Sequence, residues 1–163
     1  MLFDPLVIFG QNASIDEIRE RLDGLAADFE PIPVASLLGI GDAATDSEQV
    51  VTLALAYPTL AEAQAAADVL PRRLEAMTSL RTGRPWQEHL DEHGVSTIDA
   101  RALEREDGEG ALALLTLRAP IAGPEGDSDT GLLTASSMLY GLFVQMIQAR
   151  DTAWLAPSLP SQD

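Results

Sequence analysis

The chain contains no cysteine and no lysine. Without cysteine it can form no disulfide, no thiolate nucleophile and no cysteine-ligated zinc or iron–sulfur site. Without lysine it can form no Schiff base and cannot bind phosphate through a Walker-type lysine. Aromatic residues make up only 5% of the sequence, which favours close packing of helices on a sheet over a pocket lined by rings.

Basic residues are scarce as well. The 163 residues include 26 acids and 10 bases, every base is arginine, and the formal net charge is −16. Nucleic acids and anionic membranes are bound through a cationic face that displaces counterions. We therefore expect no nucleic-acid partner and no membrane insertion. The hydrophobic content of 46% and the charged content of 22% are typical of a globular domain.

The N-terminal residues give no indication of a secretory signal. Residues 1–10 have no basic region, and their short apolar run ends at Gly10. We expect a soluble protein, either cytoplasmic or an exported domain whose leader is absent from the sequence.

Apolar periodicity predicts secondary structure along the first half of the chain. A strand is expected at 5–10, followed by a helix over 14–29 that opens on a capping box of Ser14 and Glu17. Residues 30–48 form a connector in which 34–40 could be either a strand or a helical turn. Residues 49–57 are apolar on both faces, which predicts a strand buried on both sides.

The second half alternates helices with a hairpin. Thr59 and Glu62 form a second capping box, and the apolar register after them continues across Pro71, which predicts one kinked helix or two helices end to end. A short helix is expected at 86–93. A hairpin is predicted from residues 95–104 and 109–118, with a turn at Asp107-Gly108. The second strand is expected to be the more buried of the two.

Residues 130–149 form the longest stretch without a formal charge. Their apolar residues recur at three- and four-residue intervals, which predicts a buried helix. Asp129 and Arg150 flank this stretch with the signs that the helix dipole favours. Thr134, Ser136 and Gln145 make it too polar for a membrane span.

The predicted elements fit an α+β fold. Residues 49–150 run strand, helix, strand, strand, helix, and this βαββα order is similar to the split βαβ pattern of ferredoxin-like domains without its final strand. The predicted strand and helix within 5–29 would add an N-terminal βα unit. We expect one domain over 1–155 and a flexible tail over 156–163. This topology alone assigns no function.

Two groups of residues are candidate sites. His89, Glu92 and His93 spell H-x-x-E-H, in which two histidines on one helical face could hold a metal and Glu92 could act as general base. Pro85 and Gly94 leave that helix barely two turns long, which argues against a catalytic metal. The second group could bind an acidic ligand or partner, or could simply neutralise nearby carboxylates; it consists of Arg72, Arg73, Arg81 and Arg84.

The sequence therefore favours a non-catalytic α+β domain that binds a protein partner or a small ligand. Self-association as a homodimer through helix or sheet faces is one form of this hypothesis. No cofactor is expected. The alternative is a metal-dependent hydrolase that uses His89, Glu92 and His93. Enzymatic activity is otherwise left open, because carboxylate-based hydrolysis needs no short motif.

Overall fold

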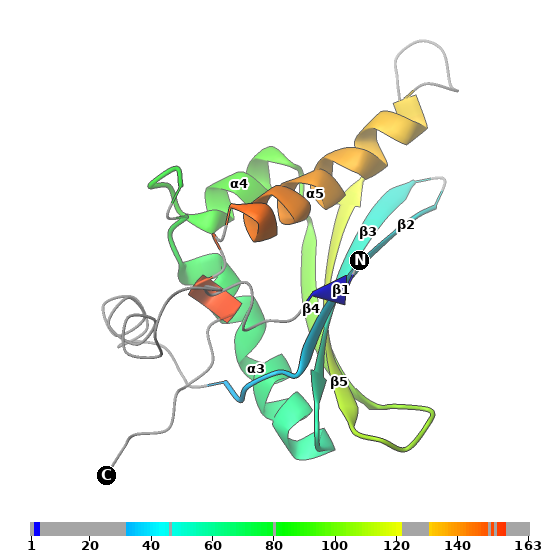
Figure 1. Cartoon of the computed structure of the whole chain (residues 1–163). Coiled ribbons are helices and arrows are strands. Elements are labelled where there is room, and N and C mark those ends of the chain that lie inside the picture. Colours follow the sequence, from blue (N-terminus) through cyan, green and yellow to red (C-terminus); the bar gives the residue numbers. More distant parts are fainter. Residues whose placement is uncertain are drawn as a thin grey trace.

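The computed structural model describes residues 2–3, 32–45, 47–79, 81–121, 131–149, 151 and 153–155. It has an α+β architecture with an antiparallel sheet and helices (Figure 1). The predicted strand at 5–10, the predicted helix at 14–29 and the predicted tail at 156–163 lie outside the described residues. The elements are β1 (Leu2–Phe3), β2 (Leu37–Ala44), β3 (Glu48–Tyr57), α3 (Leu60–Ala76), α4 (Trp86–Glu92), β4 (Thr97–Glu104), β5 (Ala111–Pro120), α5 (Gly131–Gln148) and the 3-10 turn η1 (Ala153–Leu155).

The five strands lie in the order β1-β2-β3-β5-β4, and every neighbouring pair is antiparallel. Strands β2 and β3 form one hairpin and β4 and β5 form another, and the two hairpins meet where β3 pairs with β5. The hairpin predicted from the Asp107-Gly108 turn is confirmed as β4 and β5. The segment left open between a strand and a helical turn is the strand β2.

The helix predicted after Thr59 is confirmed as one continuous helix, α3. The Thr59 hydroxyl accepts a hydrogen bond from the Glu62 backbone N–H at 3.2 Å and also donates to the Glu62 carboxylate at 2.8 Å. These bonds satisfy one of the free amides of the first turn. Pro71 lies within the helix. The helix buries an alanine- and leucine-rich stripe that includes Ala63, Ala67 and Leu70.

The uncharged stretch is confirmed as a helix, α5. Its described side chains bury one face, at Leu139, Phe143, Met146 and Ile147. Met146 and Ile147 follow Phe143 by three and four residues, and Phe143 follows Leu139 by four, which is the spacing of a single helical face. No helix in the described ranges is both long and apolar enough to cross a membrane.

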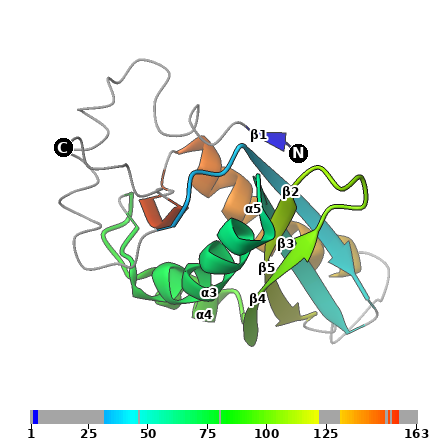
Figure 2. The same cartoon turned by 90° about the horizontal axis from the view of Figure 1, so that it is seen from below.

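The helices cover one face of the sheet only. Helix α3 packs beneath β4 and β5, and α5 packs beneath β2 and β3. Figures 1 and 2 show α3, α4 and α5 together on one side of the strands. The covered face contains the core of the protein, and its fully buried side chains on the strands include Leu38, Val51, Leu53, Leu115 and Leu117.

The prediction that β3 is buried on both faces is confirmed for one face and only in part for the other, where Ala56 is buried but Val50 and Ala54 are half-buried. Val51, Leu53 and Leu55 are buried beneath the helices, whereas the alternating Val50 and Thr52 are only half-buried. Successive side chains of a strand point to opposite faces. The apolar residues of the second face therefore do not indicate a second covering layer among the described elements.

Candidate functional site

The loop between α3 and α4 positions most of the candidate residues. Thr78 and Pro85 form an isolated β-bridge, and the Ser79 backbone N–H donates to the Arg84 carbonyl at 2.9 Å. Gly83 has a φ of 69°, a conformation that glycine adopts readily and other residues adopt at a cost. The chain therefore folds back tightly and begins α4 at Trp86.

His89 faces inward from α4. Its residue is only 8% exposed, and its ring lies 5.3 Å from the ring of Trp86. Its Nε2 atom forms a 2.8 Å hydrogen bond with the Thr82 hydroxyl. Its Nδ1 atom lies 3.9 Å from a carboxylate oxygen of Glu92, which is too long for a hydrogen bond. The imidazole thus joins α4 to the preceding loop.

The other two residues of the H-x-x-E-H pattern have partners of their own. His93 Nδ1 donates to the backbone carbonyl of His89 at 2.8 Å. Arg84 donates to Glu92 at 2.7 Å and to Glu88 at 2.9 Å. The hydrogen bond from Arg84 lowers the pKa of the Glu92 carboxyl. A metal at this position would have to compete with these bonds.

Among the residues that the structure describes, no three or more metal-ligating side chains lie close enough together to hold a metal ion. The metal-dependent hydrolase at His89, Glu92 and His93, the alternative that the sequence left open, remains a hypothesis. The predicted short helix itself is confirmed, since α4 spans only seven residues.

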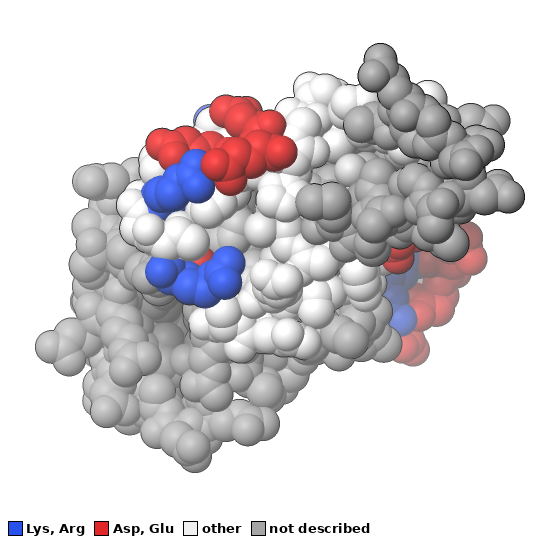
Figure 3. Space-filling model, turned by 90° about the horizontal axis from the view of Figure 1, so that it is seen from above, with Lys and Arg blue, Asp and Glu red and all other residues white. Residues whose placement is uncertain are grey.

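The four arginines of the second group have different environments. Arg73 is a buried residue of α3, and its guanidinium donates to the Trp154 carbonyl at 3.4 Å. Burial lowers the pKa of the Arg73 guanidinium. Arg84 lies in the loop before α4 and forms ion pairs with Glu88 and Glu92 of that helix, and Arg72 and Arg81 are exposed. In Figure 3 the basic and acidic side chains over α4 lie side by side.

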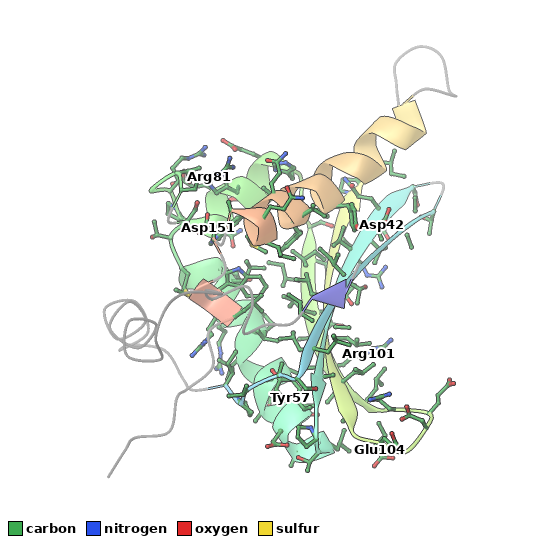
Figure 4. All side chains as sticks on the ribbon, in the orientation of Figure 1. Asp42, Tyr57, Arg81, Arg101, Glu104 and Asp151 are labelled. Atoms are coloured by element: carbon green, nitrogen blue, oxygen red, sulfur yellow. The ribbon has the colours of Figure 1, made fainter. Side chains whose placement is uncertain are left out.

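A second polar pair lies nearby that no sequence pattern indicated. The buried Ser79 hydroxyl donates to the Asp151 carboxylate, and the Thr82 backbone N–H donates to the same hydroxyl at 3.2 Å. Ser79 and Asp151 are 1% and 3% exposed. Figure 4 places Asp151 near the α4 end of the molecule. This hydrogen bond connects the segment after α5 to the loop after α3. Its role is therefore structural.

A shallow pocket of about 240 Å³ lies beside the β4–β5 turn. It is lined by Pro58, Leu60, Glu104, Gly108 and Gly110. Glu104 is the only titratable side chain among them, so the pocket has no acid–base pair for general acid–base catalysis.

The face of the sheet that points away from the helices is a further candidate surface. It is formed by alternating residues of the four long strands, and we call it the open face. Its pairs follow the strand register; they include Leu37, Ala56, Leu112 and Leu103 in one row, Gly39, Ala54, Leu114 and Arg101 in the next, Gly41, Thr52, Thr116 and Asp99 in the third, and Ala43, Val50, Arg118 and Thr97 in the fourth.

The open face carries almost no net charge. Asp99, Arg101 and Arg118 are its charged residues in those rows, and Arg118 lies 3.7 Å from Glu48 at the end of β3. The remaining side chains are leucine, valine, alanine, glycine and threonine. Leu37 and Leu103 are 39% and 37% exposed. In a chain of net charge −16, this surface is unusual because its acids, Asp99 and Glu48, are balanced by two arginines.

Comparisons with known proteins give no relative. No protein-family model, no curated protein and no solved structure matches this chain.

Proposed function

We propose that this chain is a non-catalytic binding module that docks a protein partner on the open face of its sheet. The observation that carries the proposal is the composition of that face, because exposed neutral and apolar surface is what protein interfaces bury. In an ordinary antiparallel sheet, the side chains on the solvent-facing side are mostly polar or charged. Here the half-buried Leu112 and Leu114 of β5 lie beside the small residues Ala56 and Ala54 of β3, so this part of the open face is apolar.

A protein partner is favoured over a small ligand. Ligand sites are concave and surround most of the ligand with side chains, with a few polar groups directed inward. The shallow pocket beside Glu104 has no such convergence, whereas the open face extends across four strands. A partner with a neutral, apolar surface would match it.

We also infer a ferredoxin-like arrangement of the sheet. Its support is the order β3, β5, β4, in which the third strand of a split βαβ unit lies between the first two. Strand β2 occupies the edge beside β3, where such domains place their final strand. In this chain that strand precedes the βαββα segment instead of following it. The additional N-terminal βα unit stays a prediction.

The proposal is tested by photo-crosslinking in the host cell. A photoreactive amino acid is placed at Thr52 or Leu112 on the open face, and at the exposed positions Asp68 or Glu75 on α3 as controls. We expect a discrete adduct with another protein from the open-face positions and none from α3. A second substitution, Leu114→Asp, should reduce the adduct about tenfold, because it desolvates a charge in the interface.

Two results would count against the module. Adducts that form from α3 and not from the open face would place the binding surface elsewhere. Stoichiometric zinc in the purified protein that is lost in a His89→Ala variant would favour the metal-dependent hydrolase at His89, Glu92 and His93.

A further inference from the structure

Strand β4 forms one edge of the sheet, and in the described part of the chain no strand pairs with its outer side. Natural edge strands are usually protected from pairing by a proline, a bulge, a short length or a charge that points into the core. β4 runs for eight residues in unbroken register with β5 and contains no proline. Its central positions on the covered face are Ile98, Ala100 and Ala102, which are uncharged.

The opposite edge differs. Strand β2 is paired along part of its length by β1, through Leu2↔Gly39 and Phe3↔Leu38. The sheet therefore presents one capped edge and one long edge that is available to a further strand.

The backbone groups of β4 that point outward can be identified from its register. The Arg105 N–H donates to the Gly110 carbonyl at 3.0 Å, in the same register as the β4–β5 ladder. Backbone groups of an edge strand alternate between the neighbouring strand and the free side. Residues 97, 99, 101 and 103 therefore bond to β5, and the N–H and C=O groups of residues 98, 100 and 102 point outward.

The side chains of the same strand are self-complementary. Asp99 and Arg101 lie on the open face on either side of Ala100, and neither has an ion-pair partner in the described part of the chain. In antiparallel pairing about a twofold axis at Ala100, Asp99 of each copy lies opposite Arg101 of the other. Directly opposite charges of unlike sign stabilise a strand pair, and like charges destabilise it.

This register is distinguished from its neighbours by charge. An axis at Asp99 would place two acids opposite each other, and an axis at Arg101 would place two bases opposite each other. The axis at Ala100 avoids both, and it also matches the outward backbone groups of residues 98, 100 and 102. Two copies of a chain with net charge −16 repel each other. Residues 97–103 of β4 carry one acid and one base, so the two copies can approach along this neutral segment.

We propose that two copies of this chain associate by antiparallel pairing of their β4 strands about Ala100. The two five-stranded sheets then form one continuous sheet, and the two open faces become coplanar. The proposal rests on the charge order and backbone register of β4, and it holds whether or not the open face binds a partner.

The test is a charge exchange followed by measurement of mass in solution. Arg101→Asp and Asp99→Arg each place like charges opposite each other twice per dimer, so each should raise the dissociation constant about tenfold or more. The double variant Asp99→Arg/Arg101→Asp restores opposite signs and should restore dimerisation. Sedimentation equilibrium distinguishes the 17.4 kDa chain from a species of twice that mass.

Two further variants provide controls. Arg118→Asp makes the same change in charge as Arg101→Asp but lies on β5, and it should remain dimeric. Ala100→Pro removes an outward N–H at the axis, a loss that an edge strand tolerates in the monomer. This variant should be folded by circular dichroism and monomeric by sedimentation equilibrium. A wild-type chain that is monomeric at high concentration, or a dimer that neither β4 charge variant weakens, overturns the proposal.

Discussion

The two faces of the sheet are built by the same strands, but one face is buried and the other is partly exposed. Leu53 and Leu115 are fully buried beneath α3 and α5, whereas their neighbours Thr52 and Leu114 are half-exposed on the open face. The covered face is completed by the chain's own helices. The open face is neutral and carries small or aliphatic side chains, although acids outnumber bases more than twofold in the sequence. Solubility alone would have favoured acids on that face, so its composition is the observation that supports the proposed protein contact.

The largest expected effect is a difference between the two faces in how much a leucine-to-alanine substitution lowers the free energy of unfolding. Leu115→Ala removes a fully buried side chain and should lower the free energy of unfolding by about 2–5 kcal/mol, because it leaves a cavity. Leu114→Ala on the open face should lower it by less than about 1 kcal/mol. Urea denaturation of both variants measures the difference. Equal losses would show that the open face is as well packed as the covered one.

A smaller effect is expected from the polar bond on the covered side. Ser79→Ala deprives the buried Asp151 carboxylate of a hydrogen-bond donor and should cost about 1–3 kcal/mol. Ser96→Ala is the matched control, since its exposed hydroxyl makes only a 3.4 Å bond to the Arg118 carbonyl; it should change stability by less than about 0.5 kcal/mol. If the two variants unfold at the same urea concentration, the Ser79 bond does not stabilise the segment that contains Asp151.

Local patterns in the sequence predicted most of the secondary structure. The capping residues Thr59 and Glu62 and the spacing of Ala63, Ala67 and Leu70 were enough for α3, because these signals involve residues within one or two turns. Strand β2 was harder to assign, since Gly39 and Gly41 interrupt its apolar run and glycine has a low strand propensity. Pairing with β3 in a register such as Leu38↔Leu55 supplies the stabilisation that the local sequence lacks.

The candidate sites were harder to predict from the sequence than the helices and strands. The adjacency of His89, Glu92 and His93 was visible, but their orientation was not, because it depends on Thr82 and Arg84 in the preceding loop. Apolar residues on both faces of β3 predicted burial that the open face has only in part, since composition does not show which face the helices cover. Charge pairing across a sheet edge depends on strand order, which is a tertiary property.

The polar groups on the covered face give a prediction about pH. The Tyr57 hydroxyl is buried between α3 and the sheet (Figure 4) and has no hydrogen-bond partner among the residues that the structure describes. Burial raises the pKa of the Tyr57 phenol above its ordinary value of 10.0, and the nearby Arg73 charge offsets this only in part. The folded state thus retains the phenolic proton at a pH where the unfolded chain releases it.

The smallest expected effect follows from this difference. Stability due to neutral Tyr57 is fully present below the unfolded pKa and is lost as the pH rises above about 10, because the unfolded state then binds fewer protons than the folded state. Tyr57→Phe should leave the free energy of unfolding unchanged or slightly higher at neutral pH, since it removes an unpaired polar group, and should make the alkaline loss less steep. Urea denaturation of wild type and Tyr57→Phe at neutral and alkaline pH measures the two slopes. A Tyr57→Phe slope equal to the wild-type slope would mean that water reaches the covered face at this tyrosine.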